Sequence, residues 1–271
     1  MAKHINEVVR EVCLSFPEAE EFVSHGSPNF RVRGKTFASY VVNHHGDGRV
    51  ALWLNAPTGS QDHYVNSEPK HFFVPAYVGP RGWLGVHLDK GLPWQRVAAL
   101  VRQAYEKVAP RGLADSIGET LKIKSPPAAL AADEVNPLKS RQALAILKRL
   151  RQMYLSWPEV SEDVQFGSPV WRAGKKTFAW LHADRPAQPG TPRSGKRQAR
   201  PRLKLYFWVG VAAQGLMTTD ERFEIPAYMG HNGWIALDVT EHCDWKEVRG
   251  LALASYRHFA LQRMLKDMQA Y

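Results

Sequence analysis

The sequence predicts an α+β protein of two tandem domains, each with two helices packed on one face of an antiparallel sheet. The first observation is a duplication, because segments beginning at Leu14 and Leu155 share three motifs in the same order without a gap. The second is the order of periodicities within each copy: a helical pattern, several strand-like runs, and a second helical pattern. Helices gathered on one face of an antiparallel sheet bury such an order compactly. The length of 271 residues suits two domains that each bury a core.

The duplication can be followed directly in the sequence. Leu-Ser-Phe-Pro-Glu, Gly-Ser-Pro and Lys-Thr-Phe-Ala within residues 14–38 return as Leu-Ser-Trp-Pro-Glu, Gly-Ser-Pro and Lys-Thr-Phe-Ala within residues 155–179. The offset is 141 residues there, and it is 151 residues for the Pro-Ala-Tyr motif of residues 75–79, which returns at 226–230. The second copy therefore carries a ten-residue insertion. The repeat is far longer than the roughly 20–50 residues of a solenoid unit, so it is a duplicated domain.

Each copy is predicted to begin and end with an amphipathic helix. Apolar residues fall at helical spacing over residues 5–16 and 94–108 in the first copy, and over 144–157 and 245–256 in the second. A Pro-Glu pair follows each opening helix and marks its end.

Strand-like runs lie between these helices. In the first copy they cover residues 30–32, 36–42, 49–54 and 83–88. The first two runs flank an Arg-Gly-Lys turn, in which Gly34 supplies the turn geometry of a β-hairpin.

We assign the first domain to residues 1–113, a linker to 114–137 and the second domain to 138–271. The linker contains Pro126, Pro127 and other loop-forming residues, and we expect no more than one short helical turn in it. The insertion, residues 185–204, has seven Lys/Arg and no acid among prolines and glycines. It is predicted to form an extended, mobile, cationic loop.

Charge is distributed unevenly along the chain. The net charge is +10; residues 1–113 carry 13 Lys/Arg against 10 Asp/Glu, and residues 141–271 carry 20 against 12. The second copy is therefore the more electropositive one. Such a balance favours polyanions as partners, nucleic acid first.

Cysteine usage and hydropathy indicate a cytoplasmic protein without a membrane partner. Cys13 and Cys243 have no counterpart in the other copy, which excludes a shared metal site or disulfide framework and favours buried thiols in a reducing compartment. The N-terminal residues lack the apolar core of a signal peptide, and no run approaches the roughly 18 apolar residues of a membrane span.

The recurring motifs are also those of a known family. Ser-Phe-Pro-Glu-Ala begins at residue 15, His-Gly-Ser-Pro-Asn-Phe-Arg-Val-Arg-Gly-Lys-Thr-Phe-Ala at 25, and Phe-Val-Pro-Ala-Tyr-Val-Gly-Pro-Arg-Gly-Trp-Leu-Gly-Val-His-Leu-Asp at 73. Together they resemble the MmcQ/YjbR family over residues 5–113 and, more loosely, 142–262. The resemblance implies a frataxin/CyaY-like fold and a DNA-binding protein with a double-wing arrangement. The second copy departs from the pattern where Phe166 replaces His25.

Four motifs contain residue types that occur in catalytic or ligand sites, and a structural interpretation is favoured for each. Gly34-Lys35-Thr36 lacks the earlier glycine and the following helix of a phosphate-binding loop. The Gly-Ser-Pro motif after His25 is interpreted as a turn, since no Gly-x-Ser-x-Gly pattern occurs. His44, His45 and Asp47 are interpreted as solvated turn residues, with metal binding as the alternative. The last motif is an acidic set at Glu7, Glu11, Glu18, Glu20 and Glu21, which resembles the acidic ridge of frataxins and is interpreted as a solvated helix face.

Two aromatic pairs have two open interpretations. Trp83 with Trp234, and Tyr77 with Tyr228, could stack nucleic-acid bases. Alternatively they fill the core, which the alternation of a strand favours.

We hypothesise a non-enzymatic nucleic-acid-binding protein, with weakly sequence-selective binding of duplex DNA through basic hairpin wings. The alternative is a protein-interaction or small-ligand-binding regulatory module. No catalytic residue, metal or cofactor is predicted, and the sequence predicts no oligomeric state. The predicted phosphate contacts come from two hairpin turns, Arg81 and the insertion; they are Arg31, Arg33, Lys35, Arg81, Arg172, Lys175, Lys176, Arg193, Lys196, Arg197, Arg200, Arg202 and Lys204.

Overall fold

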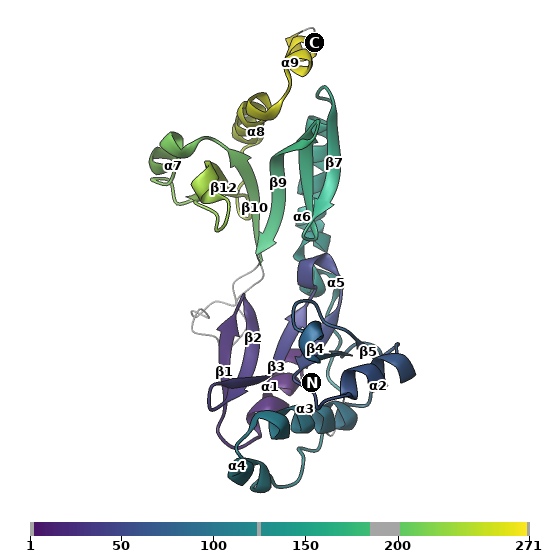
Figure 1. The fold of residues 1–271 in the computed structure, drawn as a ribbon. Helices are drawn as coiled ribbons and strands as arrows, with labels where there is room; N and C mark the ends of the chain where they lie inside the picture. The colour runs from purple at the N-terminus through teal and green to yellow at the C-terminus, as the bar shows by residue number, and fades with distance from the viewer. Residues whose placement is uncertain (1–2, 124–125, 185–200, 270–271) are drawn as a thin grey trace. The chain divides into compact units, whose positions relative to one another are not determined.

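The computed structural model describes residues 3–123, 126–184 and 201–269, and it contains two six-stranded antiparallel sheets (Figure 1). Contacts divide the chain into two units, with a boundary between Val135 and Asn136. In the first unit the strand order is β1-β2-β3-β4-β6-β5, and in the second it is β7-β8-β9-β10-β12-β11, which is the same topology. The predicted α+β class with two tandem copies is confirmed.

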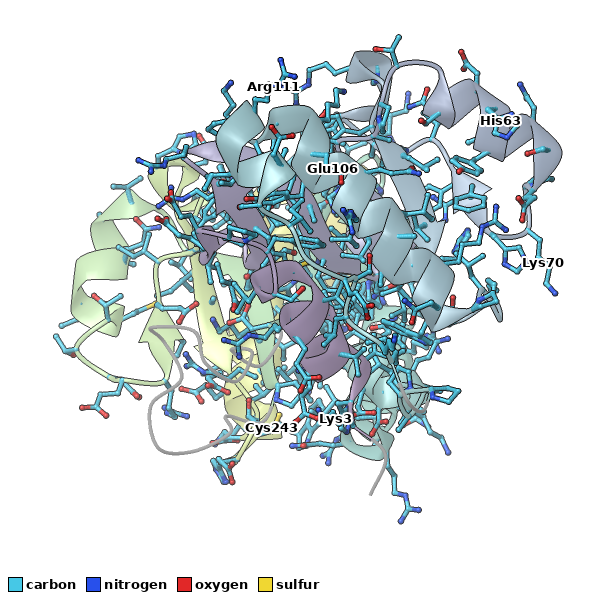
Figure 2. All side chains as sticks on the ribbon, turned by 90° about the horizontal axis from the view of Figure 1, so that it is seen from below. Lys3, His63, Lys70, Glu106, Arg111 and Cys243 are labelled. Atoms are coloured by element: carbon cyan, nitrogen blue, oxygen red, sulfur yellow. The ribbon has the colours of Figure 1, made fainter. Side chains whose placement is uncertain are left out.

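The first unit runs from α1 to α5. Its elements are α1 (Ile5–Leu14), β1 (Ala19–Ser24), β2 (Ser27–Val32), β3 (Lys35–Val42), η1 (His44–Gly46), β4 (Val50–Leu54), α2 (Ser60–Ser67), β5 (Phe72–Phe73), η2 (Gly79–Arg81), β6 (Leu84–His87), α3 (Trp94–Val108), α4 (Arg111–Asp115) and α5 (Ala132–Val135). The side chains along α3 and α4, including Glu106 and Arg111, are drawn in Figure 2.

The second unit repeats this order, with α9 following α8 as α4 follows α3, except that it begins with η3 and has no described counterpart of η1 or α5. Its elements are η3 (Pro137–Lys139), α6 (Arg141–Tyr154), β7 (Val160–Gln165), β8 (Ser168–Ala173), β9 (Lys176–Asp184), β10 (Arg202–Trp208), α7 (Val211–Met217), β11 (Phe223–Glu224), η4 (Gly230–Asn232), β12 (Trp234–Asp238), α8 (Trp245–Phe259) and α9 (Gln262–Gln269).

Local sequence explains where the major helices of the second unit begin. The Ser140 hydroxyl accepts a hydrogen bond from the Ala143 N–H at 3.2 Å at the start of α6. The Asp244 carboxylate accepts from the Lys246 N–H at 2.8 Å at the start of α8. These caps satisfy backbone donors that the first turn of a helix leaves open.

Each core is built around the same three aromatic positions. In the first unit the Tyr105 ring stacks on Phe16, with centroids 4.9 Å apart, and meets Phe37 edge-on at 5.4 Å. In the second, Tyr256 meets Trp157 and Phe178 at 5.4 and 5.5 Å.

A duplicated hydrogen bond fixes each closing helix against the turn after the opening helix. The Tyr105 hydroxyl donates to the Pro17 carbonyl at 2.6 Å, and the Tyr256 hydroxyl donates to the Pro158 carbonyl at 2.8 Å. Opening helix, closing helix and sheet therefore share one core in each unit.

The structure of the first unit adds features that the sequence did not predict. The segment after α1 forms an additional edge strand, β1, which the polar sequence Ala-Glu-Glu-Phe-Val-Ser does not reveal. Residues 114–137 contain one complete short helix, α5, together with the last two residues of α4 and the first residue of η3. Apolar side chains of this segment, such as Ile117 and Leu121, pack against the first core without any periodicity.

The predicted acidic helix face is wrong. Helix α1 ends at Leu14, so only Glu7 and Glu11 belong to it. Glu20 and Glu21 lie in β1 and Glu18 precedes that strand. The acids are therefore divided between a helix and an edge strand.

Candidate functional site

The two predicted wings are present as two-residue turns between β2 and β3 and between β8 and β9. In the first turn Arg33 and Gly34 both have positive φ, +48° and +77°, as a type I′ turn requires. In the second turn Gly174 has φ +57° and is followed by Lys175. The duplication thus places basic side chains at equivalent tips.

Acidic side chains balance the arginines of both wings. Arg31 on β2 contacts Glu20 of β1, with Nε to Oε2 at 3.1 Å. Arg33 donates to Glu18 at 2.9 Å. Arg172 lies 3.2 Å from Asp163 of β7. Exposed pairs of this kind contribute only about 0–1 kcal/mol, so a phosphate can exchange with the carboxylate at small cost.

The lysines at the tips differ from these arginines. Lys35, Lys175 and Lys176 are exposed, and so is Arg81 in η2. Within the described segments, none of the four forms an ion pair with an acid. Each wing therefore keeps at least one cation that is not neutralised by a described neighbour.

Two predicted contacts from the end of the insertion are placed differently. Arg202 and Lys204 belong to β10 rather than to a loop. Lys204 is only 4% exposed, and its Nζ lies between the carboxylates of Asp184 and Glu224. Arg202 Nε lies 2.5 Å from Asp238. The strand register turns Lys204 onto the sheet face between the carboxylates of Asp184 and Glu224, which is not the exposed loop position expected for a phosphate contact. Arg193, Lys196, Arg197 and Arg200 lie outside the described residues.

The sheet face opposite the helices differs in chemistry between the two units. By strand register, four positions of the first sheet correspond to four of the second: Val41, Ala51, Trp53 and Phe73 correspond to His182, Lys204, Tyr206 and Glu224. In the first unit they form an apolar cluster. Phe73 covers Gly85, where a Cβ would lie 2.5 Å from the ring. In the second unit the same positions are polar, and Ala236 stands where glycine does in the first.

This polar cluster contains titratable groups in a desolvated setting. Burial raises the pKa of Tyr206. Burial also lowers the pKa of His182, although the nearby Asp184 carboxylate acts to raise it. His182 lies 3.3 Å from the Ser168 hydroxyl and 3.5 Å from Asp184. Ser168 is 4% exposed and Asp184 is held by Lys204, so a solute cannot reach the serine while the sheet is intact.

The loop tyrosines do not fill the core, contrary to the interpretation favoured from the sequence. Tyr77 is 69% exposed and Tyr228 is 89% exposed, whereas Trp83 is half-buried and Trp234 is buried. Both tyrosines have left-handed backbone, with φ of +62° and +66°. A bulky residue in this region costs about 1–3 kcal/mol and marks functional sites disproportionately.

A duplicated glutamine holds each tyrosine loop. Gln61 Nε2 donates to the carbonyls of Gly79 and Trp83 at 2.9 and 2.5 Å. Gln214 Nε2 donates to the carbonyls of Gly230 and Trp234 at 2.8 and 2.6 Å.

The two glutamines are not apparent from motif spacing, because they are 153 positions apart, whereas the two tyrosine loops are 151 positions apart. They come from α2 and α7, elements that the periodicity did not predict.

Replacing Gln214 with methionine is expected to destabilise the chain by about 1–2 kcal/mol, because two loop carbonyls lose their donor. The matched change Gln61→Met should cost less, since Gln61 is partly exposed and Gln214 is buried. Urea unfolding of both variants measures the difference. An unchanged midpoint for Gln214→Met would contradict a clamping role.

The histidine turn lies beside the first tyrosine loop. His45 Nε2 is 3.0 Å from the Tyr77 hydroxyl, and the His44 ring lies edge-on to Tyr77 with centroids 5.7 Å apart. In the described part of the chain, no group of three or more His, Cys, Asp or Glu side chains is arranged to hold a metal ion.

Burial raises the pKa of the Cys13 thiol well above its usual value and raises the pKa of the Cys243 thiol to about 11.

No helix among the described residues is long and apolar enough to cross a membrane.

Comparison with known proteins defines the family. The YjbR family model matches residues 14–107 and 155–258. These two segments make up most of the chain and correspond to its two copies, so this protein belongs to the YjbR family.

Solved structures that are similar to this chain include the following two. A Deinococcus radiodurans protein described by the domain name DUF419 is 19% identical, with a TM-score of 0.35, and the match covers 41% of this chain and 82% of that one. A Pseudomonas syringae protein is 17% identical, with a TM-score of 0.34, covering 44% and 98%. A comparison with curated proteins gives no match.

Proposed function

We propose that this YjbR-family protein is a non-enzymatic, cytoplasmic binder of duplex DNA that contacts phosphates through its two hairpin wings. The observation that supports this best is duplicated: both tips carry exposed lysines without a described acidic partner, Lys35 on one and Lys175 with Lys176 on the other. The neighbouring arginines are held by carboxylates that a phosphate can replace.

The chemistry of such contacts predicts weak sequence selectivity. A lysine ammonium interacts with a phosphate as a point charge, and this contact does not depend on which base is attached. Binding releases counterions, so affinity falls steeply as salt rises. The excess of 20 Lys/Arg over 12 Asp/Glu in residues 141–271 favours a larger contribution from the second copy.

The test is a triple substitution at the tips, Lys35→Gln, Lys175→Gln and Lys176→Gln. The slope of log K against log salt should become shallower by about 0.9 for each lost contact, or about 2.7 for three. Fluorescence anisotropy with a labelled duplex across a salt series measures it.

A control with the same loss of charge changes three exposed lysines elsewhere: Lys70→Gln, Lys246→Gln and Lys266→Gln. Lys70 projects from the edge of the first unit (Figure 2). The slope of log K against log salt should change much less in this control than in the wing variant. Equal losses in the two triple variants, or no binding at low salt, would contradict the wing contacts.

A protein-interaction module is the second candidate, and one observation favours it. Val211 and Leu216 of α7 are largely exposed apolar residues. Failure of the wild-type chain to bind duplex DNA at low salt would favour this candidate over the first.

A further inference from the structure

The tyrosine loops, residues 75–79 and 226–230, present the same exposed ring twice on a firmly held support. Each contains a backbone hydrogen bond across the tyrosine, from Gly79 N–H to the Pro75 carbonyl at 2.9 Å and from Gly230 N–H to the Pro226 carbonyl at 2.9 Å. The glutamine side chains of α2 and α7 hold the other end of each loop.

The left-handed backbone at these tyrosines is not explained by packing. Asparagine or glycine would adopt the observed φ of +62° and +66° with less strain. A strained residue in a core recovers the cost through burial, but these rings are the parts of their loops that meet solvent. The same backbone strain occurs at the equivalent tyrosine of both copies, and burial of the ring does not offset it. This combination indicates that the exposed ring has a function at the surface.

The two rings have different surroundings. The Tyr77 hydroxyl is engaged by His45, and the His44 ring lies edge-on beside it. No described aromatic ring lies against Tyr228. Tyr228 therefore offers the more open face of the two.

Charge around the loops and over the chain indicates what such a ring would meet. Arg81 is exposed four residues after Tyr77, and the net charge of the chain is +10. Asn232 is at the equivalent position after Tyr228. A flat aromatic ring on a chain with an excess of positive charge fits a polyanion that carries flat groups of its own, which is a nucleic acid with accessible base faces.

We propose that Tyr77 and Tyr228 are stacking sites for unpaired bases of a single-stranded nucleic acid. The inference rests on the proposed function and adds a second mode to it, because paired bases in a duplex hide the faces that a ring can stack on. Wing lysines contact phosphates in either form, whereas the tyrosines discriminate for unpaired bases. Tyr228 contributes more than Tyr77, since its ring is more exposed.

The test uses the full chain and two labelled probes, an oligothymidylate of about 20 nucleotides and a duplex of equal length. Tyr228→Ala and Tyr77→Ala should each weaken binding of the single strand, by about tenfold for Tyr228. Affinity for the duplex should stay within about twofold of wild type. Tyr228→Trp should restore single-strand binding, because tryptophan keeps a stacking face, and Leu216→Ala serves as the control for loss of an exposed apolar side chain.

The outcomes separate this inference from the proposed function. A double variant that is folded by circular dichroism and binds the single strand as wild type does, with the salt dependence intact, would overturn the stacking sites and leave the phosphate contacts standing. Equal losses for single strand and duplex would also overturn stacking. If the wild-type chain binds neither probe at low salt, the proposed function fails as well. An oligouridylate probe should show the same tyrosine dependence, because stacking does not involve the sugar.

Discussion

Replacing Arg193, Lys196, Arg197 and Arg200 of the insertion with glutamine is expected to cause a larger loss of DNA affinity than the triple substitution at the wing tips. If all four contact phosphates, the salt slope becomes shallower by about 3.6, and affinity at 0.1 M salt falls on the order of a thousandfold. The expectation follows from sequence alone, since this segment has no acid to balance its cations. Anisotropy with a labelled duplex over a salt series measures both quantities.

The matched control changes four exposed cations outside the insertion: Lys70, Lys246, Arg249 and Lys266. Both variants lose the same formal charge, so a difference between them reports contacts rather than net charge. Circular dichroism should show both to be folded. Wild-type affinity and slope in the insertion variant would assign its cations to another role and would favour the interaction-module candidate.

Replacing Lys204 with methionine is expected to destabilise the second unit by about 2–3 kcal/mol. The change leaves two carboxylates, Asp184 and Glu224, facing each other without the cation that lies between them. Loss of one partner from a fully buried pair costs about 3–5 kcal/mol, and the cost is smaller here because both carboxylates are partly exposed. Hydrogen exchange measured by mass spectrometry resolves the loss unit by unit.

A triple variant tests the cause of that loss. Adding Asp184→Asn and Glu224→Gln to Lys204→Met removes the uncompensated charges and should recover most of the stability. The salt slope for DNA should be unchanged in Lys204→Met, because a buried lysine makes no phosphate contact. A slope shallower by about 0.9 would instead restore Lys204 to the DNA-binding residues.

Part of the candidate site could be predicted from the sequence. Turn chemistry placed Arg33 and Lys35 at a hairpin tip, because a two-residue turn has a local signature that its own residues determine. The acids that pair with the wing arginines could not be predicted. Glu20 belongs to an edge strand in which no position is fully buried, and such a strand lacks the hydrophobic alternation that identifies strands in a sequence.

The sequence by itself determined the duplication and the α+β class, because motif order and periodicity are carried by neighbouring residues. Tertiary structure alone decided three other features. Strand register turned Lys204 inward between Asp184 and Glu224. Segments distant in sequence brought Gln214 to the Gly230 and Trp234 carbonyls. A left-handed backbone turned Tyr228 out to solvent. Each depends on which segments meet in space, and residue type and spacing along the chain do not encode that locally.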